Sequence, residues 1–196
     1  DFLNRVDATR ATADAIYADA NSAYSGSGSW TPYLCQYTYE QARIDQSVLS
    51  MFGTYATYNG NSRPEASYLS LTYDLITGDV LSLSNILSEG SSSGDLRNLI
   101  VSALEVQKEE NFLDDNFAET VENNLSDSLG QYDAWYFSQN GLCFYFQPYE
   151  IAPKSSGVIV AEIPYEKLTI DDVINWCVEN NQVDWLKATA EKEVQI

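Results

Sequence analysis

Paired carboxylates are the side chains of this sequence that come nearest to a catalytic arrangement. Two acids facing each other about 5 to 9 Å apart act as acid and base, or acid and nucleophile, in most glycosidases. The chain holds 29 acidic residues, so adjacency alone carries little weight, and carboxylates in a first helical turn also stabilise the helix dipole. We therefore predict surface or capping roles and no catalytic residue. The carboxylates considered are the pairs Glu109-Glu110, Asp114-Asp115 and Asp171-Asp172 and the single residue Glu150.

Histidine is absent from the sequence, which excludes Ser-His-Asp and Cys-His catalysis as well as His-ligated zinc. The pattern of a calcium loop and that of a phosphate-binding Gly-rich loop are also absent. The three cysteines, Cys35, Cys143 and Cys177, have no CxxC spacing. They allow one disulfide with one free thiol, but their apolar neighbours favour three buried, reduced thiols. We predict no metal site and no cofactor.

The charge balance points away from polyanionic partners. Ten basic residues against 29 acidic ones give a formal net charge of -19. Such a surface repels nucleic acid and anionic membranes, whereas it attracts a cationic protein. The alternative is that the acidity only keeps a secreted domain soluble. No apolar run approaches the ~20 residues of a membrane span, and the chain begins at Asp1 without a methionine or a signal sequence. We therefore interpret it as an extracellular domain from which any leader or N-terminal membrane anchor has been removed.

Aromatic residues carry the stronger recognition signal, because tyrosine supplies 14 residues that crowd the predicted strands. Tyrosines also pair across ordinary sheets, and for any single one we favour that role. Tyr149 and Glu150 stand out, since Pro148 and Pro153 restrict the backbone on both sides of them. A rigid exposed loop loses less entropy on binding. The alternative is a bend that only joins two strands.

Periodicity places the N-terminal elements. Apolar residues recur at helical spacing from Leu3 to Tyr24, before a Ser/Gly-rich break. A period of two follows in Tyr33, Cys35, Tyr37 and Tyr39, predicting one face of a strand. A second strand is expected over 47–58. In the third, Leu69, Leu71, Tyr73 and Leu75 are expected to form the apolar face, and the partly solvated face is expected to comprise Tyr68, Ser70, Thr72 and Asp74.

The C-terminal part predicts helices over 96–104, 113–125 and 170–178, and a short one in the tail. Strands are expected at 135–137 and 142–147, joined by a type I′ turn at Asn140-Gly141. The apolar run 157–163 is expected to be a central strand covered on both faces. The predicted fold is α+β, an antiparallel sheet with helices mainly on one face. We expect an N-terminal lobe over 1–62, a core domain over 63–168 that shares the sheet, and a helical extension over 169–196.

Three segments carry distinctive motifs. They are the strand at 47–58, Leu71-Thr-Tyr-Asp-Leu-Ile-Thr-Gly-Asp-Val-Leu-Ser-Leu-Ser-Asn-Ile-Leu87, and the stretch from Phe144 to Leu168 with Pro-Tyr-Glu-Ile-Ala-Pro at 148–153 and Ile-Pro-Tyr at 163–165. Together these segments resemble the extracytoplasmic domain of the RsiV type. The loop Tyr58-Asn-Gly-Asn-Ser-Arg-Pro64 departs from the family's usual Tyr-x-Gly-Gly-Ala-His-Pro, since Arg63 replaces the histidine and Asn61 the second glycine.

The resemblance implies a non-catalytic domain at a bacterial cell surface, either secreted or membrane-anchored. In RsiV such a domain is the lysozyme receptor of an anti-sigma factor, and related domains accompany PdaC-type peptidoglycan deacetylases. We therefore expect a sensor that binds a cationic protein such as lysozyme, or a cell-wall component. The alternative is an accessory glycan-binding domain of a peptidoglycan-modifying enzyme. The candidate binding residues are Tyr58, Arg63, Tyr145, Tyr149 and Glu150.

Overall fold

The computed structural model describes residues 2–24, 26, 32–44, 48–60, 64–86, 93–125 and 132–167. Arg63, Asp171-Asp172, Cys177 and the extension predicted over 169–196 lie outside these ranges. The chain divides into two compact units. The first unit comprises residues 1–40 and 52–69, and the second comprises 41–51 and 70–196.

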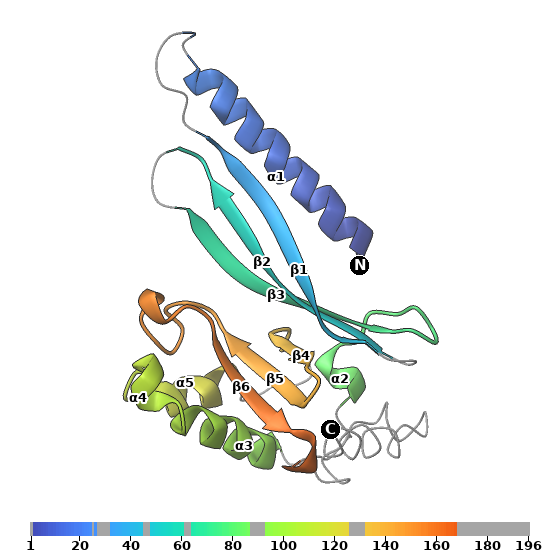
Figure 1. The fold of residues 1–196 in the computed structure, drawn as a ribbon, viewed down its shortest axis with the longest axis vertical. Helices are drawn as coiled ribbons and strands as arrows, with labels where there is room; N and C mark the ends of the chain where they lie inside the picture. Colours follow the sequence, from blue (N-terminus) through green and yellow to red (C-terminus); the bar gives the residue numbers. More distant parts are fainter. Residues whose placement is uncertain are drawn as a thin grey trace, which may run out of the picture. The chain divides into compact units, whose positions relative to one another are not determined.

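The fold is α+β, as predicted, with two antiparallel sheets of three strands each (Figure 1). The first sheet has the order β1-β2-β3, and each of its strands contributes residues to both units. Helix α1 precedes it in the chain. The bounds are α1 Phe2–Ala23, β1 Leu34–Ile44, β2 Val48–Tyr58 and β3 Glu65–Asp74.

The second sheet has the order β4-β5-β6 and belongs to the second unit. Of the described elements of this unit, the helices α2 to α5 precede the sheet, and a 3-10 turn lies on each side of its last strand. The helix predicted over 113–125 begins only at Phe117. The bounds are α2 Leu83–Ile86, α3 Ser93–Glu105, α4 Lys108–Asn111, α5 Phe117–Asn124, β4 Trp135–Phe137, β5 Gly141–Phe146 and β6 Ile159–Pro164, with the turns at Lys154–Ser156 and Tyr165–Lys167.

Helix α1 forms because its segment is rich in alanine, the best helix former, and it stops near the Ser/Gly-rich stretch. Its half-buried residues include Thr12 and Ile16, whereas Tyr17 and Tyr24 are exposed. None of the described helices is long and apolar enough to cross a bilayer. In β1, Cys35, Tyr37 and Tyr39 alternate with exposed neighbours, which confirms the predicted face.

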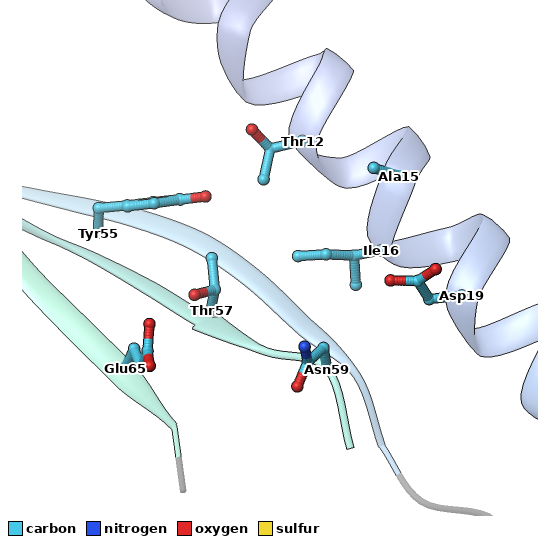
Figure 2. A pocket seen from close by; sticks show the side chains of 8 residues that line it. All are labelled: Thr12, Ala15, Ile16, Asp19, Tyr55, Thr57, Asn59 and Glu65. Carbon is cyan, nitrogen blue, oxygen red and sulfur yellow. The ribbon is translucent and has the colours of Figure 1, made fainter. Parts of the chain in front are cut away.

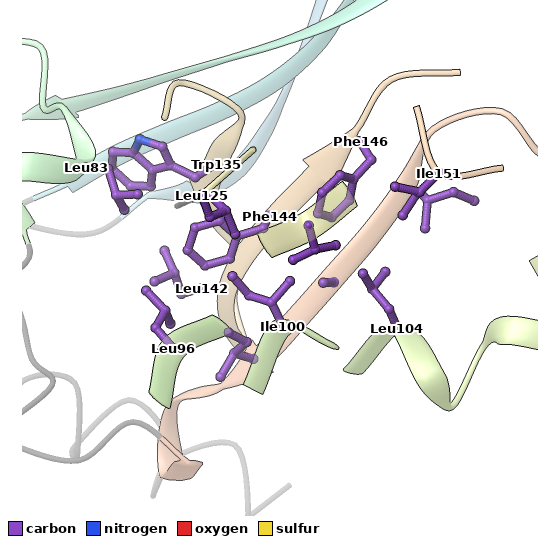
Figure 3. Close-up of a cluster of buried hydrophobic side chains, with 14 of the residues drawn as sticks. Leu83, Leu96, Ile100, Leu104, Leu125, Trp135, Leu142, Phe144, Phe146 and Ile151 are labelled. Atoms are coloured by element: carbon purple, nitrogen blue, oxygen red, sulfur yellow. The ribbon is translucent and has the colours of Figure 1, made fainter. Parts of the chain in front are cut away.

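The hydrophobic core of the second unit lies between α3, α5 and one face of the second sheet (Figure 3). Leu142, Phe144 and Phe146 of β5 point into it, and each is at most 2% exposed. Ile100 and Leu104 of α3 contribute from the helix side, as their i, i+4 spacing predicts. Burial of these large apolar side chains is the main stabilising contribution in this unit.

The central strand is β5, not the segment 157–163 to which the sequence assigned this place. All six residues of β5 are buried, and it pairs with β4 on one side and β6 on the other. Strand β6 is a sheet edge, and the side chain of Glu162, on the face opposite the core-facing residues, is exposed. Although the sequence of β6 is almost continuously apolar, only one of its faces lies in the core. Ile159, Ala161 and Ile163 face the core, whereas Val160 is only half-buried.

The face of β3 predicted to be partly solvated is buried instead. Ser70, Thr72 and Asp74 are 8%, 3% and 4% exposed, whereas Leu75 is 43% exposed. The hydroxyl of Ser70 donates to the carbonyl oxygen of Trp135 at 2.6 Å. The hydroxyl of Ser50 on β2 accepts the N–H of Phe137 at 2.9 Å and lies 2.8 Å from that of Thr72.

These hydroxyls occupy the outer edge of β4. Along a strand, alternate residues direct their N–H and C=O groups to opposite neighbours. Ala134 and Ser138 bond to β5 and its turn, so the groups of Trp135 and Phe137 point away from the second sheet. Buried backbone groups without a partner are costly, and Ser50 and Ser70 supply the partners that a fourth strand would otherwise give.

The β4–β5 turn differs from the predicted type I′ form. Neither Asn140 nor Gly141 has a positive φ. Instead, the hydroxyl of Ser138 accepts the N–H groups of Asn140 and Gly141 at 3.0 and 2.9 Å. Glycine is needed for a different reason, because a Cβ at residue 141 would lie 2.2 Å from the carbonyl oxygen of Ile163.

A buried arginine of β1 holds the end of this hairpin. Arg43 is 1% exposed and donates to the hydroxyl of Tyr165 at 2.6 Å and to the carbonyl oxygen of Ser138 at 3.3 Å. Its guanidinium also lies 5.0 Å from the centre of the Tyr165 ring. The three segments are far apart in sequence, and Gly141 pairs with Pro164, so this side chain joins β1 to the end of the second sheet where β5 begins and β6 ends.

We expect Ser50→Ala to lower the free energy of unfolding by about 1–3 kcal/mol, because it leaves the buried N–H of Phe137 without its partner. Urea denaturation monitored by fluorescence measures the change. Ser67→Ala is the control, since Ser67 is exposed on β3. A loss from Ser50→Ala no larger than that from the control contradicts the role given to this hydroxyl.

Cys35 and Cys143 are free thiols, and Cys143 is buried as predicted, whereas Cys35 is only half-buried. Burial raises the pKa of the Cys143 thiol to about 12, so little thiolate forms at pH 8. We expect iodoacetamide to modify Cys143 at least about a hundredfold more slowly in the native protein than in urea. Mass spectrometry of the peptide that contains Cys143 gives both rates. Equal rates would show that this part of β5 is accessible.

Candidate functional site

Tyr149 is an exposed aromatic residue on a tightly held loop of the second unit. Its side chain is 72% exposed, and its φ of 74° lies in the left-handed region that non-glycine residues rarely adopt. The Tyr149 N–H donates to the carbonyl oxygen of Ala152 at 3.1 Å, while Ile151 and Ala152 are buried in the core. The loop is therefore fixed from below, with the tyrosine on its outer side.

Glu150 holds the base of the same loop. One carboxylate oxygen accepts the N–H of Gln147 at 2.6 Å, and the other accepts the side-chain amide of Asn124 at 2.5 Å. Burial raises the pKa of this carboxyl group, although the bond from Gln147 opposes the change. With both oxygens engaged, Glu150 acts as a positioning residue for Tyr149. Sequence reasoning missed Asn124, which lies 26 residues away and gives no local signal.

Phe112 is a second exposed aromatic residue with strained backbone, and sequence reasoning missed it too. It is 71% exposed with φ 53° and ψ 46°. The N–H of Leu113 donates to the carbonyl oxygen of Lys108 at 3.0 Å, closing a Schellman-type end of α4 in which Phe112 takes the position that glycine usually occupies. Left-handed backbone costs an L-residue about 1–2 kcal/mol relative to glycine.

The segments that carry these two aromatic residues are hydrogen-bonded to each other. The N–H of Asp114 donates to the carbonyl oxygen of Ile151 at 2.9 Å. The hydroxyl of Ser156 donates to the backbone carbonyl oxygen of Asn111 at 2.7 Å. Four exposed carboxylates share the first segment. We call the whole set the aromatic–acidic surface: Phe112 and Tyr149 with Glu109, Glu110, Asp114 and Asp115.

Two cations accompany this surface. The Lys108 ammonium lies 3.7 Å from the Asp115 carboxylate, and that of Lys154 lies 6.0 Å from the centre of the Tyr149 ring. Both contacts are of the kinds that a basic protein surface offers, ion pairs and cation–π contacts. Among the described residues, no group of three histidines, cysteines or acids is arranged to hold a metal ion.

The other predicted binding residues fare differently. Tyr145 is 3% exposed, with its hydroxyl 3.4 Å from that of Ser70, so it belongs to the interior and offers no surface to a partner. Tyr58 ends β2 in the first unit and is half-buried. Arg63 lies outside the described residues. Of the five, Tyr149 and Glu150 share one described loop.

The first unit contains a pocket of about 290 Å³ between α1 and the sheet (Figure 2). The helix residues that line it follow the i, i+3, i+4, i+7 spacing of one helical face, and those of β2 follow the i, i+2, i+4 spacing of one strand face. The lining residues are Thr12, Ala15, Ile16 and Asp19 of α1, Tyr55, Thr57 and Asn59 from β2 and the loop after it, and Glu65 of β3.

Tyr55 forms one wall of this pocket. Its ring stacks on that of Tyr37 at a centroid distance of 4.3 Å, and Figure 2 shows its hydroxyl directed below Thr12. Burial raises the pKa of this hydroxyl, whereas a hydrogen bond with the side chain of Thr12 acts to lower it. Sequence reasoning did not predict the pocket, although Asp19 follows Ile16 by three residues and so falls on the same helix face.

Comparison with known proteins gives a family match for one part of the chain. Residues 84–166 match the model of a family described as protein of unknown function (DUF3298). No curated protein matches the chain.

Two solved structures of that family share the fold. The chain is similar to a DUF3298 family protein from Pseudomonas aeruginosa PAO1, with 16% identity and a TM-score of 0.56 over 74% of this chain and 63% of that one. It is also similar to a member of the family from Bacteroides fragilis, with 18% identity and a TM-score of 0.58 over 93% of this chain and 70% of that one. The chain thus spans less than two thirds of the length of the Pseudomonas protein.

The raised pKa of Glu150 predicts a pH dependence of stability. Glu150 is protonated more easily in the folded than in the unfolded state, so protonation stabilises the folded protein. This contribution to the free energy of unfolding is complete below the unfolded-state pKa of about 4.3 and is lost as pH rises through the folded-state pKa. Glutamine does not titrate, so we expect the stability of Glu150→Gln relative to the wild type to increase between about pH 4 and pH 7.

Urea denaturation across this pH range measures the difference. Glu122→Gln on the exposed surface of α5 is the matched control and should keep the pH profile of the wild type. Parallel profiles for Glu150→Gln and the wild type contradict the effect of burial.

Proposed function

We propose that this protein is a non-catalytic recognition domain of the RsiV type, placed outside the cytoplasm, that binds a cationic protein such as lysozyme through the aromatic–acidic surface. The observation that carries the proposal is the pair Phe112 and Tyr149. Both are exposed aromatic residues in left-handed backbone, on two segments joined by hydrogen bonds. Strain of this kind persists where the surrounding structure enforces it, and it concentrates at functional sites.

The rigidity of the surface favours binding. Glu150, Ile151 and Ala152 fix the loop beneath Tyr149, and the Schellman-type bonds fix Phe112, so a partner orders little additional chain. Aromatic residues are common among the few that dominate binding energies. The neighbouring carboxylates and the net charge of -19 attract a basic partner and raise its association rate.

The absence of catalysis is part of the same proposal. The sequence has no histidine, and the oxygens of Glu150 already accept two hydrogen bonds. Glu109, Glu110, Asp114 and Asp115 are exposed, whereas a general acid usually needs a site that raises its pKa by burial. These features support recognition over turnover.

An accessory glycan-binding domain is the alternative function. Tyr149 and Phe112 would then stack on sugar rings of peptidoglycan, and the carboxylates would accept their hydroxyls. Sedimentation of the protein with insoluble peptidoglycan tests this version, since a domain that requires a basic protein stays in the supernatant.

Glycine substitutions test the proposal. Phe112→Gly and Tyr149→Gly relieve the left-handed strain, so we expect each to leave the free energy of unfolding unchanged or raise it by up to about 1 kcal/mol. Each should nevertheless weaken binding to lysozyme about tenfold or more, because an aromatic contact is lost. Calorimetric titration at low salt measures affinity, and added sodium chloride should weaken it.

Tyr17→Ala is the control, since Tyr17 is an equally exposed tyrosine on α1, outside the surface. It should leave the affinity unchanged. If the wild type does not bind lysozyme at low salt, the lysozyme version is wrong. If the glycine variants bind as well as the wild type does, the aromatic–acidic surface is not the binding site.

A further inference from the structure

We propose that the pocket of the first unit binds a linear alkyl diamine, a small organic cation with an ammonium group at each end. The proposal concerns a site separate from the aromatic–acidic surface and does not depend on the function proposed for that surface. It rests on the charge, the shape and the chemistry of the residues that line the pocket.

The charge of the lining favours a cation. Asp19 and Glu65 bring two carboxylates, and the described lining residues include no lysine or arginine to neutralise them. The remaining polar groups are the hydroxyls of Thr12, Tyr55 and Thr57 and the amide of Asn59, all of which offer acceptor oxygens. An ammonium group has three donors and no acceptor, so this lining suits it better than an anion.

The arrangement favours two positive charges over one. Asp19 and Glu65 come from different elements, and in Figure 2 they stand on either side of Ile16. Ile16 and Ala15 form an apolar strip on the helix, which an alkyl chain can cover. The pocket of about 290 Å³ is close to the lower limit of roughly 300 Å³ for small-molecule sites, so it fits a short chain.

Tyr55 adds a neutral contact. A tyrosine hydroxyl is protonated at physiological pH, and its oxygen can accept a hydrogen bond from an ammonium group. The face of an aromatic ring also attracts a nearby cation.

Titration of the intact chain with 1,5-diaminopentane tests the proposal. Spectra of isoleucine methyl groups should show a saturable shift of Ile16, whereas Ile151, buried in the core of the second unit, should not move. Absence of a saturable shift at Ile16 overturns the proposal. So does a shift at Ile151 equal to that at Ile16, which indicates a general salt effect.

Charge-neutralising variants locate the binding. Asp19→Asn and Glu65→Gln should each weaken the affinity for 1,5-diaminopentane about fivefold, as expected for loss of one partly screened ion pair. Asp14→Asn is the matched control, because it removes the same charge from an exposed position on α1 outside the pocket. Affinities of the three variants that fall equally show attraction by net charge alone and overturn the site.

Ligands of different charge test the class of compound. Pentan-1-amine should bind at least about fivefold more weakly than the diamine, because one carboxylate stays without a partner. Ammonium groups can come from a free diamine or from lysine side chains of a protein, and a lysine tetrapeptide separates these two sources. If the peptide binds more tightly than the diamine, the pocket binds a protein side chain and the proposal is wrong. Saturable binding of the neutral N-acetylglucosamine dimer at Ile16, with none of the diamine, would replace the cation by a glycan.

Discussion

The second unit depends on two serine hydroxyls that complete the outer edge of β4. Strand β4 has three residues, and its far side would leave the N–H of Phe137 and the C=O of Trp135 buried without partners. Ser50 and Ser70 supply those bonds from β2 and β3. Side chains of the first sheet therefore complete the backbone hydrogen bonding of the second sheet. Because Trp135 and Phe137 also belong to the hydrophobic core, packing and hydrogen bonding constrain the same two residues.

Local patterns predicted much of this fold. The alanine-rich helix, the alternating tyrosines of β1 and the i, i+4 positions of α3 follow from periodicity alone. The buried face of β3 did not, because Ser70 and Thr72 are polar and their partners on β4 and β2 are distant in sequence. For the same reason an apolar run suggested that β6 was central, whereas position in the sheet is decided by pairing that no single strand encodes.

The candidate site was predictable only where the sequence marks the backbone. Pro148 and Pro153 indicated a rigid loop, and Tyr149 and Glu150 do lie on it. Phe112 carries no such mark, since nothing in its neighbours shows that α4 ends with a left-handed residue there. Tyr145 shows the opposite error, because an aromatic residue in a strand looks the same in sequence whether its hydroxyl meets water or Ser70. The pocket residues required knowledge of how α1 lies on the sheet.

The position of Arg43, Ser50 and Ser70 in the chain matters for how this domain can be excised. All three precede residue 84, where the match to the family of unknown function begins. A recombinant fragment limited to residues 84–166 would keep most of the hydrophobic core but would lack Val48, Leu81 and Leu83. It would also lose every one of these donors and acceptors. Its β4 would then expose unpaired backbone N–H and C=O groups along one side, to which strands of other molecules can pair during aggregation.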